Sequence, residues 1–222
     1  MDQLTEDFEK SLFSDTKDVL GDYIEIGVDA LINNDAIKEI PIIKTFAAVL
    51  KVGKNIHDRN LLKQTLTFID EFNKNNISIE RLNEYKYQIE NDSKKCEEEL
   101  GRVLLLLNNF IDKEKSIMLS KLYKAYVKQE ITWNEFCEYS EIINRLFIQD
   151  FSFLKEIYLG RVNDTTDRND IYRVERLNSL GIIGMSFKSS KISTINGVMS
   201  NRQDSYLTMN NNGKRFMNII MN

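Results

Sequence analysis

The chain has 222 residues, of which 42% are hydrophobic and 29% charged, and its formal net charge is −4 at pH 7. This composition is typical of a globular protein with a substantial core and excludes a disordered chain. Residues 1–149 carry 20 basic and 27 acidic side chains, whereas residues 150–222 carry 10 and 7. Only the C-terminal part therefore has the charge that contact with nucleic acid would use.

Few residues interrupt the chain, which predicts long helices. There is one proline, Pro41, and there are nine glycines. The two cysteines, Cys96 and Cys137, have neither disulfide-framework nor zinc-ligand spacing. The acidic start, residues 1–7, lacks the apolar core of a signal peptide. We therefore expect a cytoplasmic protein in a reducing compartment.

Apolar residues at helical spacing predict the first three helices over residues 15–32, 41–53 and 58–72. Residues 40–52 would form a helix of only about 20 Å, too short for a bilayer core of ~30 Å. This segment could still lie on an anionic membrane surface through Lys44, Phe46, Val49 and Lys51. Packing of its apolar face in the core is the favoured interpretation, so we do not expect this segment to contact a membrane.

The longest periodic segment covers residues 78–108, where apolar residues alternate in steps of three and four until Asp92 and Ser93 interrupt them. This heptad-like spacing predicts one long helix. The helix belongs either to the core of a monomer, which we favour, or to a seam that forms a homo-oligomer. Residues 103–107 are apolar on every side, which predicts that this turn is deeply buried.

A helix over residues 112–128 is followed by a capping box, in which Thr132 and Glu135 satisfy first-turn N–H groups of the next helix. The apolar stripe that starts at Trp133 continues to Tyr158, which predicts a helix that crosses residue 150. We place the domain boundary at this residue, between a body over residues 1–150 and a module over residues 151–222.

Two short patterns define the C-terminal module. In residues 171–183 a helix is closed by Gly181 and turns into a strand, and residues 206–216 predict a strand that enters a last helix with Asn210 as its N-cap. A polar hairpin tip, residues 189–204, separates them. The predicted fold is mainly α, with a multi-helix body followed by a small winged-helix-like α+β module that contains a two-stranded hairpin.

Residues that could support catalysis are scarce. His57 is the only histidine, and the sequence contains no glycine-rich phosphate loop or nucleophile elbow. The consecutive carboxylates Glu97, Glu98 and Glu99 point to different sides of a helix, so they would not converge on a metal ion. The sequence predicts no catalytic, cofactor-binding or metal-binding residues, no cofactor and no enzymatic activity.

The positive side chains of the C-terminal module are the candidate nucleic-acid contacts. Arg173 and Arg176 lie on the helix that would enter a major groove, and phosphate contacts would come from three residues near the hairpin, Lys188, Lys191 and Arg202. Acidic neighbours at Asp167, Asp170 and Glu175 would repel phosphate. A winged helix used for protein contact or for structural capping is therefore favoured over one that binds DNA.

The chain resembles a known group of proteins in layout and in short blocks. The blocks are residues 39–44, 56–63 and 121–126, followed by the L-x-x-L-G-I-I pattern and the ending G-K-R-F. They are similar to blocks in uncharacterised helical proteins of bacteria and their phages, and the layout resembles alpha-type abortive-infection proteins. Such families have no established catalytic residues, so the resemblance implies a role in conflict with phages and assigns no site.

We expect a non-enzymatic, cytoplasmic interaction protein that acts through contacts with a protein partner, in phage defence or prophage biology. A winged-helix regulator that binds DNA is the first alternative. A membrane-active abortive-infection effector is the second.

Overall fold

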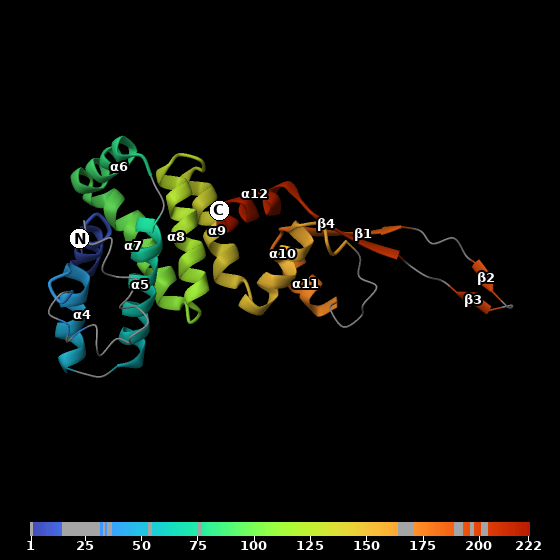
Figure 1. The fold of residues 1–222 in the computed structure, drawn as a ribbon, viewed down its shortest axis with the longest axis horizontal. Helices are drawn as coiled ribbons and strands as arrows, with labels where there is room; N and C mark the ends of the chain where they lie inside the picture. Colours follow the sequence, from blue (N-terminus) through green and yellow to red (C-terminus); the bar gives the residue numbers. More distant parts are fainter. Residues whose placement is uncertain are drawn as a thin grey trace. The chain divides into compact units, whose positions relative to one another are not determined.

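The structure is a computed structural model that describes residues 2–14, 32, 34, 37–52, 55–74, 77–163, 171–188, 193–195, 198–200 and 204–222. The described chain is mainly helical, with a small antiparallel hairpin near the C-terminus, as the sequence predicts (Figure 1). Its internal contacts divide it into two compact units, Met1–Asn144 and Arg145–Asn222. The sequence places the boundary at residue 150. The helix predicted over residues 15–32 falls almost entirely outside the described residues.

The helices of the first unit pack around α5. In chain order the elements are α1 (Gln3–Leu12), α4 (Pro41–Val52), α5 (Ile56–Lys74), α6 (Ile79–Asn91), α7 (Ser93–Asn109), α8 (Lys113–Val127) and α9 (Trp133–Arg145) (Figure 1). Four of them, α1, α4, α7 and α8, contact α5. The reason is that α5 is apolar on several sides, and its Leu62, Leu66 and Ile69 are fully buried.

The single long helix predicted over residues 78–108 is wrong. The backbone leaves the helical region at Asp92, with φ −130° and ψ 89°, and the Asp92 carboxylate accepts the Lys95 N–H at 3.0 Å as the N-cap of α7. The chain turns here, and α6 and α7 pack against each other. Tyr85 and Cys96, two of the residues in the heptad-like stripe, are buried inside the unit. The stripe thus contributes to the core of this unit.

The capping box at the start of α9 is confirmed. The Glu135 carboxylate accepts the Thr132 N–H at 2.8 Å, and Thr132 Oγ1 accepts the Glu135 N–H at 3.2 Å. The prediction of one helix from residue 133 to residue 158 is wrong, because Phe147 is extended with ψ 117°. The chain continues as the short helix η1 (Ile148–Asp150) and then as α10 (Phe151–Tyr158).

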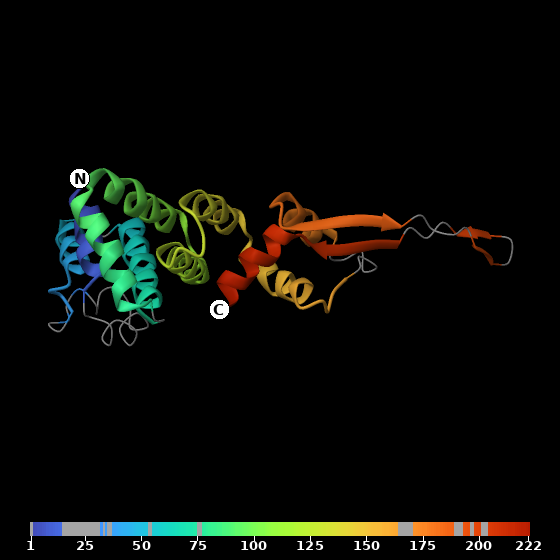
Figure 2. The same cartoon turned by 90° about the horizontal axis from the view of Figure 1, so that it is seen from above.

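The second unit combines helices with an antiparallel strand pair. After η1 and α10 come α11 (Ile171–Ser179), β1 (Ile183–Lys188), β2 (Ser193–Ile195), β3 (Val198–Ser200), β4 (Asp204–Met209) and α12 (Asn211–Met221). Strands β1 and β4 lie side by side in both views (Figure 1, Figure 2), and their register runs from Ile183 opposite Met209 to Lys188 opposite Asp204. Contacts of α11 with β1 and of α10 with β4 and α12 complete the unit.

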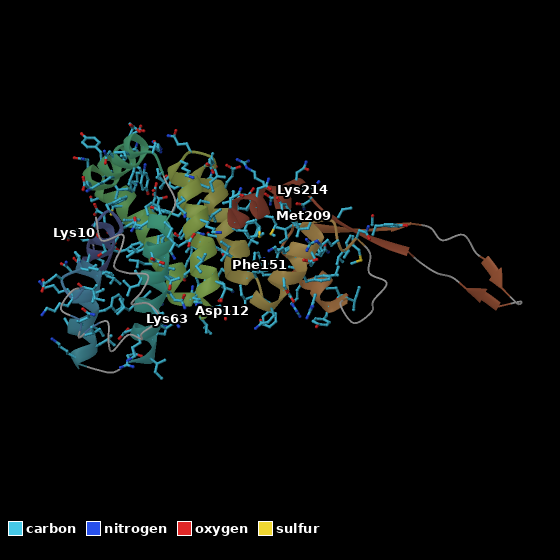
Figure 3. The ribbon with its side chains drawn as sticks, in the orientation of Figure 1. Lys10, Lys63, Asp112, Phe151, Met209 and Lys214 are labelled. Atoms are coloured by element: carbon cyan, nitrogen blue, oxygen red, sulfur yellow. The ribbon has the colours of Figure 1, made fainter. Side chains whose placement is uncertain are left out.

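Asn210 joins the two patterns that the sequence analysis singles out in this unit. Its Oδ1 accepts the Gly213 N–H at 2.8 Å, which confirms the predicted N-cap, and its Nδ2 donates to the Gly181 carbonyl at 2.7 Å. Gly181 has φ 74°, a backbone conformation that glycine adopts without strain. Met209 and Lys214 mark the corner where β4 enters α12 (Figure 3). One side chain therefore fixes the base of the hairpin.

Candidate interaction site

The first unit contains an open groove of about 800 Å³ bounded by α1, α5, α7 and α9. Its apolar lining comes from all four helices and consists of Leu4, Leu61, Leu104, Leu105 and Trp133. Pockets that bind ligands or partner side chains have volumes of this order, with apolar walls and a few polar groups. The groove is therefore the best candidate for a functional site in the described part of the first unit.

Leu105 is the most exposed leucine in the groove. The sequence predicts that the whole turn 103–107 is buried, and Val103 and Leu107 are indeed inaccessible. Leu105 is 68% exposed, because α7 has other helices on only part of its circumference. The prediction for this residue is wrong. An exposed leucine and a partly exposed tryptophan that line one groove provide apolar surface of the kind found where proteins bind one another.

The charged residues of the groove are mainly acidic. Asp2, Glu97 and Glu98 line it with exposed side chains. Arg102 is the only basic residue among the described lining residues, and its Nη2 donates to the Glu141 carboxylate at 3.0 Å. The groove therefore presents a negative potential beside an apolar wall.

Gly101 leaves space in the middle of the α7 wall. A Cβ atom placed on this residue would have no described heavy atom within 4 Å, other than its own helix backbone. Glycine inside a helix lowers stability by roughly 0.5–1 kcal/mol relative to alanine. Packing among the described residues does not require this glycine, and these residues leave the space above it open to another molecule.

The thiols of the chain are held in their protonated form. Burial raises the pKa of Cys137, which lines the groove, and it raises the pKa of Cys96 to about 12. A reactive cysteine needs the opposite shift, because the thiolate is the nucleophile. The Cys137 environment therefore favours a packing role for this side chain over attack on a substrate.

The inner side of α7 is closed by a network of hydroxyl groups. Tyr85 and Tyr126 donate to the two oxygens of the Glu99 carboxyl group, each at 2.6 Å, and the hydroxyls of Tyr85 and Tyr123 hydrogen-bond to each other. Burial is the main cause that raises the pKa of all three tyrosines. Because its polar atoms face one another inside the core, this network holds α6, α7 and α8 together.

In the second unit, the predicted DNA-contacting arginines lie against a buried carboxylate. Arg176 donates two hydrogen bonds to Asp150, at 2.7 Å each, and Arg173 Nε lies 3.8 Å from the same group. Asp150 has a 1% exposed side chain. The guanidinium of Arg176 also lies over the rings of Phe147 and Tyr172. The structure therefore brings these two arginines together around Asp150, and their ion pairs connect α11 to the last residue of η1.

The remaining predicted nucleic-acid contacts are only partly described. Lys188 is the last residue of β1, where the backbone alone is described, and Lys191 and Arg202 lie outside the described residues. That these three side chains share a site with Arg173 and Arg176 therefore stays a prediction.

The residues predicted to touch a membrane divide between two sides of α4. Phe46 is 4% exposed, and its helix packs on α1 and α5, so this residue belongs to the core. Lys44, Val49 and Lys51 point outward. Core packing therefore applies to Phe46, and Val49 alone supplies an outward apolar side chain among these four. No helix in the described residues combines the length and apolar character that crossing a bilayer requires.

His57 is exposed in the first turn of α5 and is not among the residues that line the groove. In the described residues, no three histidine, cysteine, aspartate or glutamate side chains gather as ligands of a metal ion would.

Comparison of the chain with protein-family models, with curated proteins and with solved structures found no match.

Proposed function

We propose that the protein is a non-enzymatic interaction protein that works in the cytoplasm and binds a protein partner in the groove of its first unit. The observation that carries this proposal is the open groove of about 800 Å³, which is lined by Trp133 and by a Leu105 that is 68% exposed. Removing such a patch from water stabilises a complex in proportion to the apolar area covered.

Site-specific photo-crosslinking in cells tests this function. A photoreactive phenylalanine analogue replaces Leu105, and in a control it replaces Tyr87, which is 67% exposed on α6 and does not line the groove. We expect a discrete crosslinked product from position 105 alone, and we expect it to disappear when Gly101→Leu fills the groove. Equal patterns from both positions, or no product at position 105, would contradict the proposal.

The biological setting we propose is phage defence or prophage biology, and its support is the resemblance in layout to alpha-type abortive-infection proteins. Phage plating on a bacterial host with and without the chain measures it directly. The wild-type chain should lower plating efficiency, and the Gly101→Leu variant should lose the effect because the groove is blocked. Equal plating efficiency with and without the wild-type chain would contradict a role in phage defence.

A second candidate is a winged-helix-like DNA-binding module, and it is favoured by the order α11, β1, β4, α12 with an antiparallel strand pair between the helices. Against it, Arg173 and Arg176 already engage Asp150. Anisotropy of a labelled duplex over a salt series distinguishes the two candidates, because phosphate contacts weaken steeply with salt. The absence of binding at low salt would exclude the DNA function.

A further inference from the structure

We infer that the groove accepts a basic, amphipathic α-helix of a partner protein; this inference rests on the proposed function and names its partner class. The recognition surface is an outward stripe along α7. Glu97, Gly101 and Leu105 follow one another in steps of four residues, so they lie one above the other on the same side of the helix. The stripe therefore presents charge, open backbone and an apolar side chain in this order.

Charge complementarity selects a basic occupant. Asp2, Glu97 and Glu98 line the groove with exposed carboxylates, and Arg102 is the single basic residue among the described lining residues. An acidic segment would be repelled here, while lysine or arginine side chains at the edge of an apolar helix face would meet carboxylates. The apolar residues of the same helix would cover Leu105 and Trp133.

Gly101 indicates that the occupant approaches the α7 backbone closely. Alanine at this position would favour the helix, and its Cβ would meet none of the described atoms around it. A side chain here would, however, hold a docked helix away from α7. Glycine at a helix contact allows two backbones to come near one another, which explains a residue that the described unit itself does not need.

The occupant is helical because the groove offers no edge for strand addition. Its walls are α1, α5, α7 and α9, whose backbone groups are hydrogen-bonded within the helices. An extended peptide would lose hydrogen bonds to water without gaining partners. A helix satisfies its own backbone groups and needs only side-chain complementarity, as in other complexes in which a helix docks into a groove.

Charge disfavours two other occupants, residues 15–33 of this chain and a second copy that docks through the same face. Residues 15–33 carry five acidic side chains and one lysine. A second copy that docked through the same face would place Glu97 and Glu98 near their own counterparts, because a two-fold contact pairs identical surfaces. Both arrangements bring like charges together in the groove.

The chain contains its own reporter for this inference, because its only tryptophan, Trp133, lines the groove. Two synthetic peptides of about 18 residues, long enough to form a helix, carry leucine on one face and either lysine or glutamate on the other. We expect the leucine–lysine peptide to change Trp133 emission saturably and the leucine–glutamate peptide to leave it unchanged.

Two variants and a size measurement complete the test. Gly101→Leu should abolish the emission change while its circular dichroism and melting temperature stay at least equal to those of the wild type. The double change Glu97→Lys with Glu98→Lys should weaken binding about threefold to tenfold, since exposed charges contribute modestly. Light scattering at the same concentration should show that the apparent mass does not depend on Gly101.

Four outcomes would overturn the inference: no saturable change at peptide concentrations up to about 1 mM, equal binding of both peptides, unchanged binding by Gly101→Leu, or self-association that Gly101→Leu prevents. The first three outcomes concern the peptides alone. If position 105 still gives a groove-dependent crosslink in cells, the inferred partner class is wrong but the proposed function as an interaction protein is retained. If the crosslink is also absent, the proposed function fails with it.

Discussion

Gly101 in α7 and Gly213 in α12 are both glycines inside helices, one in each compact unit, yet their surroundings are opposite. A Cβ on Gly101 would meet no described atom within 4 Å, whereas a Cβ on Gly213 would lie 2.1 Å from the Ile182 carbonyl oxygen. At Gly213 the α12 backbone therefore rests directly on the start of β1. At Gly101 the described residues leave the corresponding space open.

This difference shows that α12 packs directly against another segment at its glycine, whereas the described residues leave one side of α7 uncovered at its glycine. Glycine at position 213 allows close contact within the unit, so the reason for it lies in the fold. At position 101 the described fold supplies no such reason, and the same property would serve contact with another molecule. On its other side, α7 is closed by the tyrosine network around Glu99, so only its outer face is open.

The largest expected effect is a loss of folding stability at high pH, caused by the tyrosine network on the inner side of α7. Burial raises the pKa of Tyr85, Tyr123 and Tyr126 in the folded protein above the ordinary value near 10. Above pH 10 the unfolded chain therefore loses phenolic protons that the folded chain retains, so stability falls as pH rises. The slope approaches about 4 kcal/mol per pH unit for three tyrosines.

Urea unfolding between pH 8 and pH 11, followed by circular dichroism, measures this slope. Replacing Tyr85 with phenylalanine should reduce it by about a third, since one of the three titrating groups is removed. A free energy of unfolding that stays level above pH 10 would show that these hydroxyls are not held as the structure indicates.

Gly213→Ala should produce the next largest effect and destabilise the second unit by about 2–3 kcal/mol, because backbone atoms must move to admit the methyl group. Hydrogen exchange of the β1 and β4 amides reports the loss within this unit. Gly184→Ala is the matched control, because its Cβ would make ordinary contact with Thr208 Oγ1 at 3.6 Å. If Gly213→Ala and Gly184→Ala destabilise the unit equally, the close backbone contact at Gly213 is not what makes glycine necessary there.

Asn210→Ala should cost about 1–2 kcal/mol, since the Gly213 N–H and the Gly181 carbonyl both lose their partner. Asn210→Asp provides the informative control: a carboxylate keeps the cap but cannot donate to Gly181, so an intermediate free energy of unfolding is expected. If alanine matches the wild type in a denaturant titration, this side chain does not fix the base of the hairpin.

Gly101→Ala should have the smallest effect and the opposite sign, a gain of up to about 1 kcal/mol from helix propensity in open space. Thermal unfolding should place its melting temperature above that of the wild type. A lower melting temperature would mean that the space above Gly101 is needed by the fold itself, and the comparison with Gly213 would collapse.

Local sequence signals predicted the fold where the interaction itself is local. The capping box at Thr132 and the N-cap at Asn210 each depend on residues three positions apart, and both are confirmed. The apolar period also identified Tyr85 and Cys96 as one stripe. It could not show that the chain reverses at Asp92, because a helix cap and an interruption of the stripe look alike in sequence.

The candidate site was less predictable, because its parts come from distant positions. The groove lining is drawn from α1, α5, α7 and α9, and no motif links them. The pairing of Arg176 with Asp150 spans 26 residues, so sequence analysis interprets this arginine as a residue of a helix that would enter a major groove and does not identify its acidic partner. Gly101 is the one local signal that was available, since a glycine inside a strong helical pattern requires a reason.

The geometry of the β1–β4 strand pair, whose base is held by Asn210, determines where a foreign domain can be inserted into this chain. Lys188 and Asp204 stand opposite each other at the outer end of the antiparallel stem, so their Cα atoms are about 5 Å apart. Whatever sequence connects them leaves and re-enters the unit at neighbouring points. A foreign domain whose own ends are adjacent, such as a fluorescent label, can be spliced in there without stretching the unit that receives it.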